Sequence, residues 1–439
     1  MRLVAAFLLL SALPAAAQDK KRAAPPLPYP PTLPEGKESV THSTPEFLKP
    51  ISPLREGVEI AKTPPTVDFL YYPGQDHPGK PWSVWGDGCA SGDKYYSAIG
   101  DHLSPKGTAQ VYEYDATTKK LRLLVDLRKF FESSNLLPPD MNYIPGKIHS
   151  RIELGKDGWL YYSTHRGSPS TTNDQHGYKG DWVLRTHPES GATEVVARFP
   201  VPKHAIPTSV LDPERLIFYG GTAPGKDAAA QEVQFFAWDI QGKRLLLSAG
   251  GGPKRCAILS RSTGRLTWDG KMFDPERSDR LGESKAPDVR SATQETPQGI
   301  VYGTTDRSAD LWAYDVKNDT LTMLGPGAVG KQEYTTTIDA DPTGRYLYYI
   351  PGGHGGGPTD GTPVVQYDVK LKKRKVIAFL HPFHLNAVGY TLEGTFGSAL
   401  DPKGERLYIT WNGMRKEQPR GWESCALTVV HIPASERQP

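Results

Sequence analysis

The sequence predicts an all-β fold, a seven-bladed β-propeller of four-stranded antiparallel blades closed by an N-terminal strand. Three observations support this prediction: a composition rich in turn and strand residues, a recurring strand signature, and a β-rich segment left over ahead of the first repeat. The chain has 439 residues, among them 44 glycines, 40 prolines, 21 tyrosines and 9 tryptophans. This usage is typical of many short strands joined by turns, rather than of long helices.

The recurring signature is a short strand that carries aromatic or β-branched residues and ends at Asp or a polar equivalent. From Asp115 to His431 its instances are on average about 53 residues apart, close to the propeller periods of roughly 40–50 residues. The fourth repeat, near residues 255–284, is abbreviated. The instances lie at residues 111–115, 182–186, 236–239, 272–274, 311–315, 365–368 and 427–431.

Each signature predicts the third strand of a blade, because a turn and a β-rich run precede it and a further strand follows most instances. Several of the turns have hairpin chemistry, such as Asp157-Gly158. The last repeat ends after its third strand, so residues 66–72 are predicted to supply its outer strand and close the ring. The predicted inner strands are residues 83–90, 147–154, 204–211, 254–260, 289–295, 334–340 and 395–400.

The first residues of the chain predict export. Arg2, an apolar run at residues 3–13 and a small-residue stretch ending at Ala17 indicate a signal peptide over residues 1–17, cleaved after Ala17. Residues 18–64 are rich in Pro and Lys and are predicted to form an extended leader. Residues 65–439 are predicted to form a single propeller domain. No later stretch has the roughly 20 apolar residues of a membrane span. We therefore expect a secreted or periplasmic protein without a membrane span.

Charge and cysteine content exclude some classes of protein. A formal net charge of +3 gives no global basic field for nucleic acid. Only Cys89, Cys256 and Cys425 occur, so at most one disulfide forms, and their spacing leaves the pairing open. We expect the cysteines to be buried as small apolar residues, in a fold stabilised by its size rather than by cross-links.

The candidate site lies at one face of the propeller, around the mouth of the central channel. Inner strands begin at this face and second strands end there, so residues distant in sequence are expected to converge. The candidates from inner-strand starts are His149, Arg151, His204, Arg255, Arg290 and Tyr334, and those from second-strand ends are His165, Arg166 and Tyr219.

The most informative segment is residues 147–167, which reads as a hairpin. In it His149 and His165 are expected to pair across the strands, flanked by Arg151 and Arg166. Imidazoles serve as general acid and base near neutral pH, and arginine neutralises a carboxylate. Such groups suit β-elimination at a uronic acid, with Tyr219 as a further catalytic acid.

Other interpretations of the same residues stay open. His149 and His165, with His204 or His354, would hold a divalent metal ion, although no tight metal motif occurs. No cofactor is otherwise indicated. The basic residues would also simply fill the channel. Trp411 and Trp422, on a long loop at the same face, are candidates for stacking on sugar rings.

The repeats resemble those of secreted bacterial propellers with YVTN, WD40-like and gluconolactonase-like repeats. The paired histidines and nearby arginines resemble, over a single hairpin, the arrangement in propeller polysaccharide lyases such as the ulvan lyases. The resemblance implies an exported enzyme acting on an anionic polysaccharide. The alternatives are a non-catalytic propeller that binds a glycan, a protein or another extracellular ligand, and a metal-dependent hydrolase or lactonase.

Overall fold

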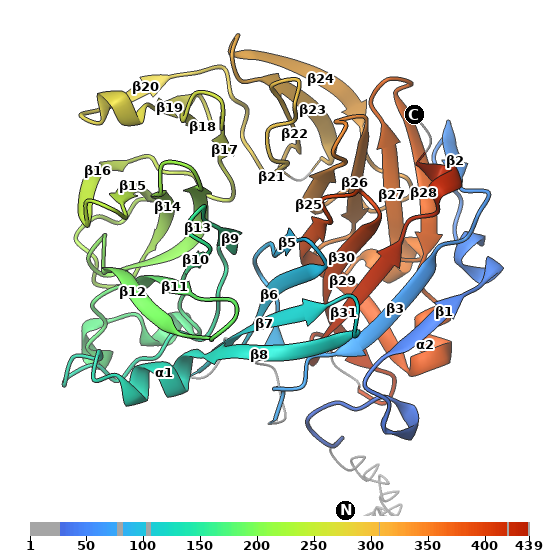
Figure 1. The fold of residues 1–439 in the computed structure, drawn as a ribbon, viewed down its shortest axis with the longest axis horizontal. Coiled ribbons are helices and arrows are strands. Elements are labelled where there is room, and N and C mark those ends of the chain that lie inside the picture. The colour runs from blue at the N-terminus through green and yellow to red at the C-terminus, as the bar shows by residue number, and fades with distance from the viewer. Residues whose placement is uncertain (1–26, 77–81, 102–106, 307, 419–420, 438–439) are drawn as a thin grey trace, which may run out of the picture.

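The computed structural model is an all-β ring of seven antiparallel sheets around a central channel, which confirms the predicted propeller (Figure 1). It describes residues 27–76, 82–101, 107–306, 308–418 and 421–437. The predicted signal peptide lies outside these residues. None of the described helices is long and apolar enough to cross a membrane.

Blades 1 to 4 follow one another along the chain. Blades 2 to 4 pair their strands in sequence order, and in blade 1 the first two short strands both pair with the third. Blade 1 is β4 (Trp82–Ser83), β5 (Cys89–Ser91), β6 (Lys94–Asp101), β7 (Ala109–Asp115) and β8 (Lys120–Asp126). Blade 2 is β9 (Glu153–Leu154), β10 (Leu160–Ser163), β11 (Trp182–Thr186) and β12 (Thr193–Arg198). Blade 3 is β13 (His204–Asp212), β14 (Ile217–Pro224), β15 (Gln234–Asp239) and β16 (Arg244–Gly250). Blade 4 is β17 (Ile258–Leu259), β18 (Leu266–Trp268), β19 (Lys271–Phe273) and β20 (Leu281–Glu283).

Blades 5 to 7 complete the ring, and the last two take strands from the N-terminal segment. Blade 5 is β21 (Ser291–Ala292), β22 (Ile300–Thr304), β23 (Asp310–Asp315) and β24 (Thr320–Pro326). Blade 6 is β25 (Thr335–Ala340), β26 (Tyr346–Pro351), β27 (Pro363–Asp368) and β28 (Lys373–Phe379), extended by β2 (Val58–Ile60). Blade 7 is β29 (Tyr390–Leu400), β30 (Arg406–Arg415), β31 (Ser424–His431), β3 (Thr66–Tyr71) and β1 (Val40–Ser43).

Short helical segments lie in the connections between strands. Helix α1 (Leu127–Ser133) follows β8, and Asp126 caps it by accepting the backbone N–H groups of Arg128 and Lys129. Helix α2 (Phe383–Val388) links blades 6 and 7. The single-turn 3-10 segments are Pro34–Gly36, Pro45–Leu48, Pro169–Thr171, Asp174–His176, Pro275–Arg277, Gly357–Asp360 and Ala434–Glu436.

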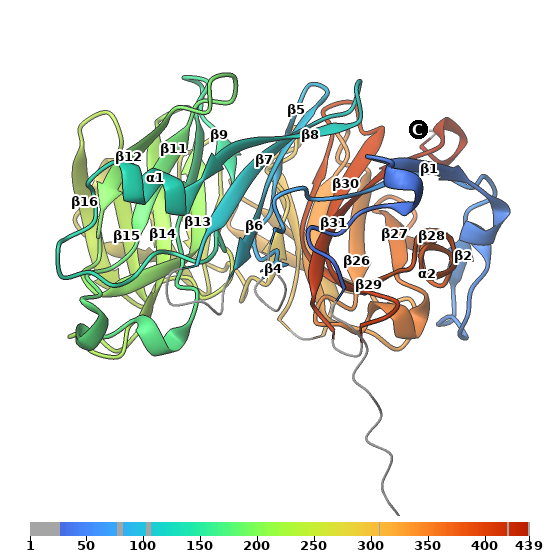
Figure 2. The same cartoon turned by 90° about the horizontal axis from the view of Figure 1, so that it is seen from below.

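Strand β3 closes the ring as predicted. It pairs antiparallel with β31 from Thr66 opposite His431 to Tyr71 opposite Ala426. The segment ahead of it, which the sequence predicts to be extended without regular strands, also adds β1 to β3 and β2 to β28, along the outer edges of blades 6 and 7 (Figures 1 and 2). Unpaired edge strands attract other chains, so these additions cover two of the exposed edges.

The core is divided among the seams between blades. In the described part of the chain, seven apolar clusters are found, each shared by two adjacent blades. Large aromatic side chains such as Trp82, Trp182 and Trp312 are fully buried in these seams. Their burial fixes neighbouring blades against each other, which positions the strand ends that surround the channel.

The inner strands differ most from the prediction. The inner strand of blade 1 is interrupted between Ser83 and Cys89, where Gly86 lies so close to Ser150 that a Cβ would be 2.0 Å from its carbonyl oxygen. In blade 2 the predicted inner strand at residues 147–154 is regular only at β9. Ahead of it the Ser150 hydroxyl replaces ladder bonds, because it accepts the Ser163 N–H at 2.9 Å and donates to the Ser163 carbonyl at 3.1 Å. Crowding at the axis therefore shortens the strands that line the channel.

Candidate functional site

A small cavity, here called the upper cavity, occupies the channel mouth at the predicted face. Its volume is about 40 Å³. Residues from inner-strand starts of several blades surround it, as the sequence predicts. The side chains used below are Trp85, Asp87, His149, Arg151, Thr208, Arg255, Arg290 and Phe396.

Two arginines of the upper cavity lack an acidic partner. Arg290 is only 7 % exposed; its Nε donates to the Tyr334 hydroxyl at 2.7 Å, and its guanidinium lies over the Tyr334 and Phe396 rings. Arg255 is exposed at the rim. Within the described chain neither guanidinium forms an ion pair, and Arg255 has no hydrogen bond either. The charge of Arg290 counteracts the burial that raises the pKa of Asp87, so Asp87 compensates part of this buried charge. The terminal nitrogens of Arg290 suit a further, anionic partner.

Arg151 is already neutralised. Its Nε lies 3.3 Å from Oδ2 of Asp87, and its Nη2 donates to the Ala292 carbonyl at 2.7 Å. This ion pair lies between the upper cavity and a second cavity further along the channel, since both residues line both spaces. Arg151 therefore forms a floor for the upper cavity.

His149 is held in the wall of the upper cavity and is a weak base. Its Nδ1 lies 2.9 Å from the Pro207 carbonyl, so Nδ1 carries the proton of the neutral ring. Burial, and then the charge of the nearby Lys147, lower the pKa of His149 to about 3. The ring stacks on Trp85 and meets the His165 ring edge-on, with centroids 5.3 Å apart.

The two histidines are neighbours, but the expected cross-strand pairing is off by two residues. His165 forms an isolated antiparallel bridge with Lys147, not with His149. His165 is 6 % exposed. The Lys147 ammonium lies 4.5 Å from the Trp85 ring centre, and burial together with the charge of Arg166 lowers its pKa to about 7.

Aromatic rings roof the cavity. Trp85 contacts Phe396 and Trp422, with ring centroids 4.9 Å and 5.3 Å away. His354 is stacked between Tyr334 and Trp422 and meets Phe396 edge-on. Cationic and aromatic groups therefore alternate around one mouth. Sequence reasoning missed Trp85, Phe396 and Thr208, because an aromatic or a threonine near a strand end is usually a packing residue.

Several predicted site residues lie elsewhere. Tyr219, the proposed acid, is 1 % exposed and packs between blades 3 and 4 against Phe235 and Phe273. His204 is buried, with Nδ1 at 2.8 Å from the Thr222 hydroxyl and Nε2 at 3.0 Å from the Ala230 carbonyl.

Two more predicted residues also lie outside the lining of the upper cavity. Arg166 donates to the Pro224 carbonyl at 3.3 Å. Trp411 is fully buried in a blade seam and donates to the Thr428 hydroxyl, so it cannot stack on a sugar, whereas Trp422 lies at the mouth.

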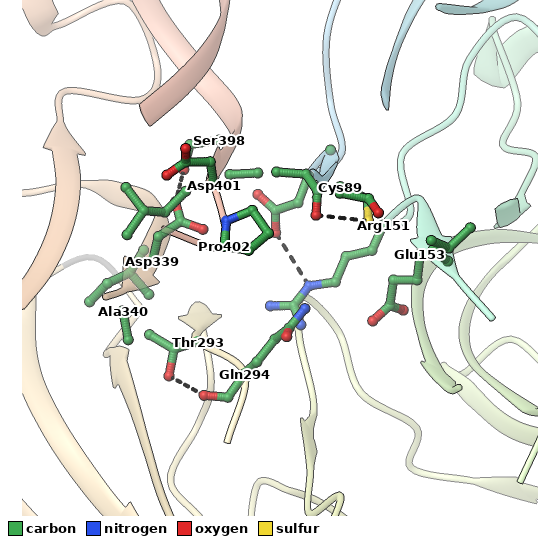
Figure 3. Close-up of a pocket in the computed structure, with 18 of the residues that line it drawn as sticks. Cys89, Arg151, Glu153, Thr293, Gln294, Asp339, Ala340, Ser398, Asp401 and Pro402 are labelled. Atoms are coloured by element: carbon green, nitrogen blue, oxygen red, sulfur yellow. Dashed lines mark hydrogen bonds and ion pairs between the residues drawn. The ribbon is translucent and has the colours of Figure 1, made fainter. Parts of the chain in front are cut away.

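The second space, the lower cavity, is larger, about 430 Å³, and opens where the inner strands end (Figure 3). Carboxylates dominate its wall, with Arg151 reaching in beside Glu153 and with Asp339 across from it. Burial raises the pKa of Asp339 to about 7 and raises the pKa of Glu153. Two Asp-Pro-x-Gly turns in the sequence, which begin at Asp341 and Asp401, were the signal for acidic residues at this end.

The described residues do not form a metal site. In that part of the chain no three His, Cys, Asp or Glu side chains are grouped so as to hold a metal ion. His204, proposed as a third ligand, already has both ring nitrogens within hydrogen-bond distance of protein partners. The three cysteines are free thiols, with Cys256 and Cys425 buried.

Comparison with known proteins supports the fold class, a seven-bladed β-propeller. No family model matches the chain, and no curated protein matches it by sequence. Two solved structures are similar to it: "Structure of U3-55K" and "Crystal structure of RRP9 WD40 repeats". Each match has a TM-score of 0.50 and a sequence identity of 10%, and each covers 81% of this chain. The matches cover 97% of the chain in the first structure and 96% of the chain in the second. At this identity the likeness concerns the fold alone.

Proposed function

We propose that this protein is a non-catalytic binding propeller that captures an acidic polysaccharide at its upper cavity. The observation that carries the proposal is the buried guanidinium of Arg290, which faces a cavity and has no carboxylate partner among the described residues. The roof of Trp85 and Trp422 adds half-buried aromatic surface of the kind that packs on sugar rings. The predicted signal peptide accords with an extracellular ligand.

Binding suits this geometry better than cleavage. A general base works best with a pKa near the operating pH, and the pKa of His149 is far below it. His165 does not line the upper cavity, and neither does Tyr219. Of the three catalytic candidates only His149 lines the upper cavity, where it suits the wall of a recognition site.

The first prediction concerns Arg290. We expect Arg290→Met to weaken binding to immobilised polygalacturonate or alginate about tenfold or more, because a charge-assisted contact is lost. Arg244→Met, on the exposed outer strand of blade 3, is the matched control and should bind like the wild type. Dextran, which is neutral, should not bind. Equal affinity of Arg290→Met and the wild type, or preferential capture of polyglutamate, would sink the polysaccharide proposal.

The second prediction concerns pH. The pKa of Lys147 is lowered to about 7, so its ammonium is charged below that pH and neutral above it. An anionic ligand favours the charged form, and the affinity should therefore fall as the pH rises from about 6 to 8. Lys147→Met should bind more weakly at pH 6 and lose most of this dependence. A wild-type affinity that rises across the same window contradicts the assignment.

The third prediction separates binding from cleavage. Prolonged incubation with the same uronate polymers should produce no ultraviolet absorbance from unsaturated products, because no competent base faces the upper cavity. If absorbance rises and His149→Ala abolishes the rise, the protein is a lyase and the binding proposal is wrong.

A further inference from the structure

The upper cavity is small, and two donor-bearing side chains, Arg290 and Thr208, line it. We propose that it is a seat for a single carboxylate, so that the ligand is recognised through uronate groups and not through sulfate esters. This inference rests on the proposed function and specifies its ligand.

The first support is volume. The upper cavity has only about a tenth of the volume of the lower cavity, about 40 Å³ against about 430 Å³. A carboxylate consists of one carbon and two oxygens and fits this space. A sulfate ester is larger and tetrahedral, so a planar carboxylate suits this small space and the planar fork of the Arg290 guanidinium better.

The second support is an unfilled set of donors. Thr208 is 3 % exposed and lines the upper cavity, and its Oγ1 is a buried hydroxyl with no hydrogen-bond partner among the residues that the structure describes. The Arg290 Nε donates its hydrogen bond to Tyr334, which leaves the N–H groups of the two terminal nitrogens to donate to a ligand. Buried polar groups are nearly always satisfied, so both residues are suited to donate hydrogen bonds to a bound acid group.

Local backbone geometry explains why Thr208 faces the channel. Strand β13 shifts register between Ala205 and Thr208, next to Pro207, which has no N–H for the sheet. The irregularity exposes the Pro207 carbonyl to His149 and brings Thr208 into the cavity wall. A bulge that re-aims a side chain at a binding site is a recurring use of this feature.

The charges around the upper cavity favour a negatively charged ligand over a neutral one. Arg151 and Asp87 neutralise each other at the floor. Arg255 and Arg290 remain, and both lower the pKa of His149 and of His354, which shows that their positive field reaches across the mouth. A carboxylate seated between Thr208 and Arg290 would compensate this field.

The test uses three sugars with one ring and different substituents: galacturonate, galactose 6-sulfate and galactose. Each is titrated into the full chain at constant ionic strength, with binding followed by calorimetry and by tryptophan fluorescence, since Trp85 borders the cavity. We expect galacturonate to bind at least tenfold more tightly than galactose 6-sulfate, with galactose undetectable. Equal or tighter binding of the sulfate overturns the inference.

A variant pair locates the effect. Thr208→Val keeps the side-chain shape and removes the hydroxyl, and should weaken galacturonate binding about tenfold. Thr267→Val changes a buried threonine of blade 4 outside the cavity and should leave binding unchanged. If the polymers bind in an Arg290-dependent manner but galacturonate has no advantage, the carboxylate seat is wrong and the proposed function stands. If neither polymers nor galacturonate bind, both fail.

Discussion

Phe69→Ala is expected to lower the free energy of unfolding by about 3–5 kcal/mol, the usual cost of removing a large aromatic side chain from a core. Phe69 lies on the closing strand β3 and is fully buried. Its ring contacts Tyr71, Tyr390 and His384, so one residue joins the N-terminal strand to blade 7 and to helix α2. Urea denaturation followed by tryptophan fluorescence measures the loss.

The control for this prediction is an apolar residue of the outer surface. Leu245 on β16 is 42 % exposed, and Leu245→Ala should change stability by less than about 0.5 kcal/mol. If Phe69→Ala also falls within that range, β3 does not close the ring in solution.

Glu423→Ala is expected to cost about 3–5 kcal/mol, because it leaves a buried cation without its anion. Glu423 is 4 % exposed and Arg415 8 % exposed. The Arg415 Nε donates to Oε1 of Glu423 at 2.8 Å, the Arg415 backbone N–H donates to Oε2, and the Tyr29 hydroxyl donates to Oε1 at 2.7 Å. The same variant should shift the fluorescence of the adjacent Trp422.

An exposed ion pair gives the comparison. Glu194 pairs with Arg185 on blade 2 at 2.6 Å, but its side chain is 51 % exposed. Glu194→Ala should therefore cost no more than about 1 kcal/mol in the same urea titration. Similar losses for the two variants would show that the Arg415–Glu423 pair is hydrated and does not anchor the loop that presents Trp422.

The middle strands of the blades were predictable from the sequence, because they are long enough to show their pattern. The signature at residues 311–315, for example, falls within β23 (Asp310–Asp315). The inner strands β13 and β25 also match the prediction. Those of blades 2, 4 and 5 do not, since β9, β17 and β21 have two residues each, and in blade 2 the Ser150 hydroxyl replaces ladder bonds. Strands of two residues are too short to show the alternation of apolar and polar residues that identifies a strand in a sequence.

The site was predictable in part for the same reason. Inner-strand starts do face the channel, which placed His149, Arg255 and Arg290 correctly at one mouth. Side chains of second strands point into the seams between blades, so Tyr219 became core. His204 precedes the register shift in β13 and stays outside the cavity lining, whereas Thr208 follows the shift and lines it. Only Pro207, a proline within a strand, signalled that irregularity.

The most direct measurement is a crystal structure of the protein with a bound oligogalacturonate. The account predicts a sugar carboxylate in the upper cavity, within hydrogen-bond distance of an Arg290 terminal nitrogen and of the Thr208 hydroxyl, with the sugar ring against the aromatic roof. An oligosaccharide seated in the lower cavity or along a blade edge, with the upper cavity unchanged, would contradict it.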